Sequence, residues 1–210
     1  MKADGDVRPP VVGKPSGPLP IGDRDENPKD IGLIALLAED FRTYENNPLD
    51  PAFWAVAVHR FGNWRMGRPK LVRAPLTVAY RLLYHSLCLI ADVNIPYTTK
   101  LGRRVRIWYR GGVHLGARSI GNDVNIRNNT TFGVLHKENP QEKPVIEDGV
   151  DVGIGCCVLG DVTVGAKSVI GANSVVVRSV PPGTTVFGVP ARPVNLTPSP
   201  SPTPGNGKQG

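Results

Sequence analysis

The sequence has few cysteines, few aromatic residues and no long uninterrupted apolar run, and each shortage excludes a class of protein. Three cysteines in 210 residues, without framework spacing, argue against a secreted disulfide scaffold. Aromatic residues make up 6% of the chain and no nucleic-acid motif is present, so the formal charge of +7 is expected to be mostly solvated surface. Arg73, Arg81 and His85 interrupt the apolar stretch at 71–91, which is therefore not expected to span a membrane.

Both ends of the chain lack apolar patterning. Residues 1–29 are rich in Pro, Gly and Asp and contain no aromatic residue, so they are expected to form a disordered arm without a signal peptide. Residues 196–210 are low in complexity and are expected to form a disordered tail. No cluster of His, Cys, Asp and Glu has ligand spacing, so no metal is expected. We expect a cytoplasmic protein.

A six-residue period dominates residues 146–181. Each unit opens with a branched aliphatic residue: Ile146, Val152, Val158, Val164, Ile170 and Val176. An amphipathic helix repeats every 3.6 residues and a strand alternates every two. A period of six is typical of a short strand plus a turn, repeated, and so it predicts a β-solenoid.

The same rhythm extends upstream. It starts at Ile95, breaks by one residue at Ser119, and resumes at Ile120. Residues 136–145 are predicted to form a loop extruded from the solenoid, which would occupy 93–181. Three hexads per triangular coil would give about four coils, enough to bury a continuous core.

Three helices are predicted over residues 30–92, ahead of the solenoid. The first is capped by Asp30 and has one apolar face, formed by Ile31, Ile34, Leu37 and Phe41. The second starts at Asp50-Pro51 and runs to about Gly67. The third covers about 74–91, with Leu76, Tyr80, Leu83 and Leu87 on one side. These apolar faces are expected to pack on each other or on a second subunit.

Several motifs resemble those of a known superfamily. The segments I-G-A-N-S-V-V, P-P-G-T-T and G-V-P-A-R, within 170–192, are similar to hexapeptide-repeat acyltransferases. D-P-A at 50–52 and H-R-F-G-N-W at 59–64 resemble serine O-acetyltransferases. The resemblance implies a mainly β fold, a left-handed parallel β-helix preceded by a small α-helical domain, with a closing segment at 182–195. It also implies a homotrimer with acetyl-CoA in a groove between subunits.

The resemblance also places the acetyl-CoA contacts. By register, two turns correspond to those that hold the pantetheine arm, namely Gly153-Ile154 and Gly171-Ala172. Arg178 and Arg192 are candidates for the CoA phosphates, because guanidinium binds phosphate bidentately. The alternatives are that the turns need glycine for their own geometry and that both arginines are solvated.

Acetyl transfer in this family uses a histidine that takes the proton of the acceptor hydroxyl. At the positions that match the family's Asp, catalytic His and loop His, this chain has Asn94, Tyr109 and Lys143. His136, at the start of the predicted loop, and His114, at an outward hexad position, are the remaining candidates for the base. Asp123 and Glu142 are candidates for an orienting carboxylate.

The sequence favours the first of three functions, and the other two are alternatives. A sugar or polysaccharide O-acetyltransferase suits the polar loop and the relocated histidine. Serine O-acetyltransferase of cysteine biosynthesis suits the helical front. A catalytically degenerate homologue, acting as a structural or interaction partner, suits the missing Asp and His.

Overall fold

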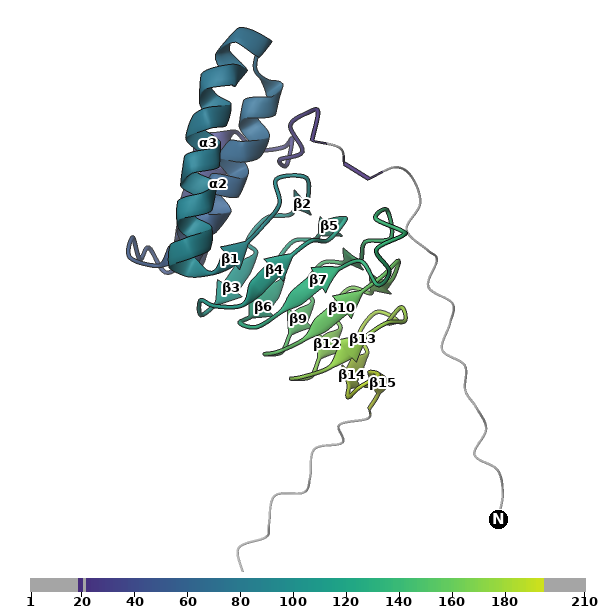
Figure 1. Cartoon of the computed structure of the whole chain (residues 1–210). Helices are drawn as coiled ribbons and strands as arrows, with labels where there is room; N and C mark the ends of the chain where they lie inside the picture. The colour runs from purple at the N-terminus through teal and green to yellow at the C-terminus, as the bar shows by residue number, and fades with distance from the viewer. Residues whose placement is uncertain (1–18, 21, 195–210) are drawn as a thin grey trace, which may run out of the picture.

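The computed structural model describes residues 19, 20 and 22–194, and they form a parallel β-helix with three helices at its N-terminal end (Figure 1). The predicted fold class is confirmed. The helices are α1 (Leu33–Thr43), α2 (Pro51–Trp64) and α3 (Lys70–Ala91), with a 3-10 turn, η1 (Arg65–Gly67), between the last two. Asp50 caps α2 as predicted, since its Oδ1 accepts a hydrogen bond from the N–H of Ala52 at 2.9 Å.

The solenoid has three sheets, which we call A, B and C. Sheet A contains β1 (Val93–Asn94), β4 (Val113–Leu115), β7 (Thr131–Gly133), β10 (Cys157–Leu159) and β13 (Val175–Val176). Sheet B contains β2 (Lys100–Leu101), β5 (Ser119–Ile120), β8 (Val145–Ile146) and β11 (Thr163–Val164). Sheet C contains β3 (Arg106–Trp108), β6 (Asn125–Arg127), β9 (Asp151–Val152), β12 (Val169–Ile170), β14 (Thr185–Phe187) and β15 (Arg192–Pro193). Each strand except β15 pairs in parallel with its neighbours, one coil away.

The hexad pattern identifies the core. Every residue predicted to open a hexad is buried, with at most 2% of its surface exposed: Ile95, Leu101, Ile107, Val113, Ile120, Ile126, Phe132, Ile146, Val152, Val158, Val164, Ile170 and Val176. Side chains alternate between the two faces of a strand, so the residues beside these point outward. The core is therefore one continuous apolar column along the solenoid.

The register of the early coils differs from the prediction. Phe132 pairs with Leu115, whereas Val113 pairs with Val93. Leu115 follows Ile107 by eight residues instead of six, with the extra residues in the wide turn 109–112. Ile120 then follows Leu115 by five residues, which restores most of the period. This turn can be accommodated because Gly111 and Gly112 adopt φ angles of 104° and 65°, which glycine reaches without steric cost. The predicted break at Ser119 was therefore misplaced.

The stack has five turns rather than the predicted four. β1 adds a strand before the first predicted hexad, and β14 continues sheet C beyond Val180, which bridges to Val164. The predicted closing segment at 182–195 thus completes the last coil, with β15 folding back antiparallel on β14. The loop between Gly133 and Val145 leaves the solenoid where it was expected.

Helix α1 differs from its prediction at its start and in its buried face. It begins at Leu33, and Gly32 occupies the N-cap position without a side-chain cap. Ile34 is 85% exposed, whereas Leu36 and Asp40 are buried. The apolar pattern was misleading because the buried face contains an ionised residue.

Asp40 belongs to a buried ion pair with Arg60, and this pair joins the helical domain to the first coil. Arg60 of α2 and Asp40 of α1 are fully buried, with Nε and Oδ2 2.9 Å apart. The guanidinium also donates to the carbonyl oxygens of Leu101, at 2.7 Å, and Gly102, at 2.5 Å. Buried charges persist only when paired and hydrogen-bonded. Arg60 therefore fixes both helices against the first coil.

The segment before α1 is partly ordered. Asn27 is buried and its Nδ2 donates to the carbonyl oxygen of Arg60 at 2.9 Å, and the N–H of Glu26 donates to Oδ1 of Asn63 at 3.3 Å. The predicted arm at 1–29 therefore packs against α2 over its last residues. Its first 18 residues, Ile21 and the tail from 195 onward lie outside the described residues.

Helix α3 begins at Lys70, earlier than predicted, and stands along the outer side of the helical domain (Figure 1). By length and composition it could cross a membrane, with a mean hydropathy of 1.2 over its most apolar 18-residue window. Its inner face nevertheless packs on α2, where the Tyr80 ring lies against Gly62. An added Cβ at Gly62 would lie 2.5 Å from that ring.

Candidate functional site

A row of polar side chains crosses the outer face of sheet A close to the end of α3. Asn94 of β1 pairs with His114 of β4, which pairs with Thr131 of β7. Val113 and Leu115 are buried on either side of His114, so strand alternation directs the imidazole outward. Three neighbouring coils thus contribute an amide, an imidazole and a hydroxyl to one surface.

Helix α3 supplies a fourth member of this row. The hydroxyl of Tyr84 donates to Oδ1 of Asn94 at 2.5 Å. Burial raises the pKa of Tyr84 to about 12, so the phenol stays protonated at neutral pH and remains a donor. The amide of Asn94 is thereby held in place beside His114, although an amide cannot provide the negative charge that stabilises an imidazolium.

His114 has the properties of a neutral base. Partial burial lowers its pKa, and the charge of Lys143 lowers it further. Lys143 is at the end of the extruded loop, which is therefore near enough for its charge to act on this ring. Space for the ring depends on Gly116, where an added Cβ would lie 3.0 Å from Nε2 of His114.

His136 is placed differently. It lies in the exposed loop, where its main-chain carbonyl accepts a hydrogen bond from Asn139 at 3.1 Å. Its ring makes no hydrogen bond or ion pair with any residue that the structure describes. Within one chain the structure therefore places His114, rather than His136, in the polar row.

The orienting carboxylates proposed from the sequence are not beside His114. Both oxygens of Asp123 accept from Arg104, at 2.6 and 2.7 Å, and this arginine lowers the pKa of Asp123. Asp123 is thus committed to an ion pair at the N-terminal end of the stack, where Arg104 also contacts Glu39 of α1. Glu142 lies in the loop, where its N–H donates to the carbonyl of Asn139.

Tyr109, at the position of the family's catalytic histidine, is 73% exposed and adopts a φ of 64°. It lines a cleft of about 570 Å³ between the start of α2 and the turn after β3, together with Asn47, Leu49, Asp50, Pro51, Arg106, Ile107, Trp108 and Arg110. The neighbouring Trp108 is fixed by its Nε1, which donates to Asn125 at 2.9 Å, and by the guanidinium of Arg106 over its ring. Tyr109 therefore belongs to a different surface from His114.

The predicted cofactor turns are stacked at the corner between sheets C and A. The N–H of Asn173 donates to the carbonyl of Ile154 at 2.7 Å, which brings Gly153-Ile154 under Gly171-Ala172. The N–H groups of Gly153 and Gly171 donate to the next coil, at 2.8 Å each. Those of Ile154 and Ala172 donate no hydrogen bond to any residue that the structure describes, so two donors one coil apart are without an acceptor.

Coil packing also explains the glycines of these turns. An added Cβ at Gly153 would lie 2.6 Å from the backbone nitrogen of Ala172, and one at Gly171 would lie 2.2 Å from the Phe187 ring. Gly165, which has no proposed cofactor role, has the same restriction against Pro182, at 2.4 Å. Glycine at this hexad position is thus required by the stack, whatever binds outside it.

The two arginines predicted for the CoA phosphates lie at the C-terminal end of the stack. Arg178 is exposed in the turn after β13, and Arg192 is exposed on β15. Neither forms an ion pair within the described part of the chain. The described residues also contain no group of three or more His, Cys, Asp and Glu that could hold a metal ion.

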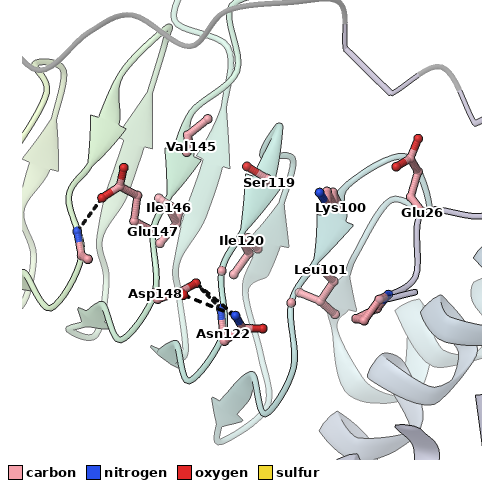
Figure 2. A pocket seen from close by; sticks show the side chains of 14 residues that line it. Glu26, Lys100, Leu101, Ser119, Ile120, Asn122, Val145, Ile146, Glu147 and Asp148 are labelled. Carbon is pink, nitrogen blue, oxygen red and sulfur yellow. Dashed lines mark hydrogen bonds between the residues drawn. The ribbon is translucent and has the colours of Figure 1, made fainter. Parts of the chain in front are cut away.

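A second cleft, which the sequence did not reveal, crosses the outer face of sheet B (Figure 2). Its volume is about 500 Å³, and Glu26 and Pro28 of the N-terminal segment form one wall. Its carboxylates already have partners, because Glu147 accepts from the N–H of Ala166 at 2.8 Å and Asp148 from the N–H of Asn122 at 2.7 Å. Glu147 and Asp148 therefore cap turns of the solenoid on this face.

No protein-family model matches the chain, but similar proteins share its sequence and fold. Serine acetyltransferase from Synechococcus elongatus is 34% identical over 172 residues, which cover 76% of this chain and 68% of that protein. Soybean serine acetyltransferase, solved with serine, superposes with a TM-score of 0.65 at 31% identity, covering 77% of this chain and 69% of that one. Serine acetyltransferase from Brucella abortus, solved with coenzyme A, superposes with a TM-score of 0.65 at 27% identity. The match covers 77% of this chain and 67% of that one. The chain spans about half the length of other curated relatives. It covers 54% of the serine acetyltransferase of Escherichia coli.

Proposed function

The chain belongs to the serine acetyltransferase family, and from that premise we propose that it transfers the acetyl group of acetyl-CoA to a hydroxyl group. The observation that carries this proposal is the 34% identity to a serine acetyltransferase over most of both chains. The N–H groups of Ile154 and Ala172 support it, because they have no acceptor among the described residues and can donate to the amide carbonyls of a pantetheine arm.

His114 is the proposed general base. Its neutral imidazole takes the proton of the acceptor hydroxyl, and the oxygen attacks the thioester carbonyl to form a tetrahedral oxyanion. Collapse of that intermediate breaks the C–S bond and gives the acetyl ester. The CoA thiolate leaves and recovers the proton from the imidazolium. The lowered pKa of His114 keeps the ring unprotonated and ready to accept the proton.

L-Serine is the first candidate for the acceptor. The sequence alone favoured a sugar hydroxyl, but the comparisons favour the alternative: the similar proteins are serine acetyltransferases, and one was solved with serine. A sugar hydroxyl is the second candidate, because Asn94, Tyr109 and Lys143 replace the residues that match the family's Asp and two histidines. Without the family's Asp, the base lacks the negative charge that would stabilise its imidazolium.

A thiol-release assay tests the acceptor and the base together. Acetyl-CoA is supplied with L-serine and, separately, with polysaccharide acceptors. We expect thiol release with serine, and we expect His114→Ala to lower kcat by about two orders of magnitude, the usual effect of removing a general base. Arg42→Ala, at an exposed residue of α1 outside both the row and the loop, is the control and should leave the rate unchanged.

Each other outcome selects a different hypothesis. Release with a polysaccharide alone would replace serine by a sugar acceptor. A loss of rate in His136→Ala, with His114→Ala unaffected, would move the base to the loop. If neither acceptor gives thiol release above background and neither histidine matters, the chain is a degenerate homologue with an interaction role.

We also propose that the protein assembles as a homotrimer, with the loop of one subunit placing His136 near the site of its neighbour. The exposed position of His136 supports this arrangement. Light scattering on the full chain tests it directly, and a monomeric mass would contradict both the trimer and a site shared between subunits.

A further inference from the structure

The outer face of α3 is apolar and uncovered. Seven large aliphatic residues on it are between 48% and 91% exposed: Leu71, Val72, Val78, Leu82, Leu83, Leu89 and Ile90. At 100° per residue they fall on one side of the helix, opposite Tyr80, Tyr84 and Leu87. Only 11% of the most apolar window of α3 is buried within this chain. Such a helix has an apolar face that a partner or a lipid phase covers.

The charge around this face has one sign. No Asp or Glu occurs between Asp50 and Asp92, whereas six Lys and Arg residues do. Four of them lie on α3 or directly before it: Arg68, Lys70, Arg73 and Arg81. None of these four has a carboxylate partner within the described residues, although Arg103, Arg104, Arg106 and Arg127 on the solenoid are all paired. At 100° per residue, Lys70 and Arg81 lie about 60–80° beyond Val78, on the flank between the apolar stripe and the packed face, and Arg73 lies on the packed face beside Tyr80.

The inner face of α3 excludes a transmembrane arrangement of the folded helix. Tyr80 is buried, stacks on Tyr84, and receives the guanidinium of Arg65 4.4 Å from its ring centre. A helix spanning the bilayer would have to withdraw these groups from the domain. One apolar face is therefore accessible while the other stays packed, as in a helix that lies in the plane of an interface.

We propose that the outer face of α3 docks on an anionic phospholipid bilayer. The aliphatic stripe enters the boundary between head groups and acyl chains, and the exposed side chains of Lys70 and Arg81 on its flank reach lipid phosphates. Each cation near such a surface strengthens binding about fivefold, and salt weakens that contribution. A second copy of the chain fits this face less well, because each copy would bring the same unpaired cations to the contact with no carboxylate to receive them.

Vesicle co-sedimentation of the full-length protein tests the proposal, with phosphatidylcholine vesicles that contain or lack phosphatidylglycerol. We expect binding only to the anionic vesicles, and we expect it to weaken several-fold between ~0.1 and ~0.5 M salt. The double variant Leu82→Ser/Leu89→Ser should lose binding. Lys70→Gln/Arg81→Gln should weaken it by about 25-fold, that is, about fivefold for each cation.

Matched controls remove residues of the same kind from other surfaces. Val189→Ser, at another exposed aliphatic residue, and Lys137→Gln, at an exposed cation, should bind vesicles as the unchanged protein does. Far-UV circular dichroism and melting curves establish that each variant is folded. These readouts do not depend on acetyl transfer, so they succeed or fail independently of the proposed enzymatic function.

Two results would overturn the proposal. The first is equal binding to vesicles with and without phosphatidylglycerol, or no binding to either. The second is a fall in the particle mass of Leu82→Ser/Leu89→Ser by light scattering, without any lipid binding by the unchanged protein, which would assign the face to a second copy.

Discussion

His59 should make this protein lose stability in mild acid. The ring is 2% exposed between α2 and the first coil, and its Nε2 lies 2.9 Å from the carbonyl oxygen of Thr99. Burial lowers the pKa of His59 to about 3, and the neighbouring charge of Arg60 acts in the same direction. The ring is therefore neutral in the folded protein throughout the range in which an unfolded chain would protonate it.

The magnitude follows from proton linkage. The unfolded chain binds a proton at His59 below a pKa of about 6.5, while the folded protein does not until about 3. Between these two pKa values, each unit by which the pH is lowered reduces the free energy of unfolding by about 1.4 kcal/mol. This contribution is fully present above pH 6.5 and decreases below it. At pH 5 the loss from His59 alone is about 2 kcal/mol.

Urea unfolding at about pH 7.5 and about pH 5 measures this loss. The matched variant is His59→Gln, whose amide nitrogen can still donate to Thr99 without titrating. Protomer concentration must be equal in all samples, because the stability of an oligomer depends on it. We expect the unchanged protein to lose about 2 kcal/mol more than His59→Gln over this interval. The other histidines, including His114, are present in both proteins, and their contributions cancel.

Equal losses in the two proteins would refute the reasoning. That result would mean that His59 protonates in the folded state near its ordinary pKa, and therefore that water reaches the ring. A larger loss in His59→Gln would be equally contrary, since glutamine has no proton to gain in this range.

Two further substitutions test the packing of the domain and of the solenoid. Arg60→Gln should lower the free energy of unfolding by about 3–5 kcal/mol in urea, because it leaves the carboxylate of Asp40 buried without its partner. Arg127→Gln, in a half-exposed pair at 40% and 38%, should change it by less than about 1 kcal/mol, and equal costs would contradict the argument. Gly153→Ala should lower the melting temperature, at a cost of about 1–3 kcal/mol, because its Cβ would lie 2.6 Å from the nitrogen of Ala172; an unchanged melting temperature would show that the coils can separate there.

The solenoid could be predicted from sequence because its rule is local. A six-residue period identifies each inward position without knowledge of any distant residue, and Val158 or Ile170 needs no partner to be recognised. The same rule did not give the register of the coil that contains Val113 and Leu115. Both are buried and aliphatic, and only the pairing with Phe132 shows which one continues the column. Register in that coil depends on the wide turn 109–112, whose conformation the period does not encode.

The helical domain was predicted less completely because its core is partly polar. Asp40 and Arg60 have the composition of a solvated surface, and neither was predicted to be buried. Their burial becomes understandable only with the carbonyl oxygens of Leu101 and Gly102 nearby, which lie about forty residues away in sequence from Arg60. A sequence pattern of apolar residues cannot reveal a buried ion pair that is satisfied by another domain.

The candidate site shows the same limit. The alternation Val113-His114-Leu115 was enough to place the imidazole outside the solenoid. Asn94 and Thr131 lie beside His114 because the coils stack in register. Tyr84 belongs to the row only because α3 ends beside β1, where its hydroxyl donates to Asn94. Sequence spacing therefore gave His114 as a candidate, but the reason to prefer it over His136 is three-dimensional.

The two faces of α3 explain how one helix can serve both the proposed chemistry and the proposed docking. Tyr84 faces inward and holds Asn94 beside His114, whereas Leu82 and Leu89 face outward. Arg60 ties α2 to the first coil, and α3 packs on α2 and is bonded to β1 through Tyr84 and Asn94. A lipid surface bound to the outer face would therefore hold the polar row in one fixed orientation. Docking and acetyl transfer are separable by mutation for the same reason, since no residue of the aliphatic stripe belongs to the row.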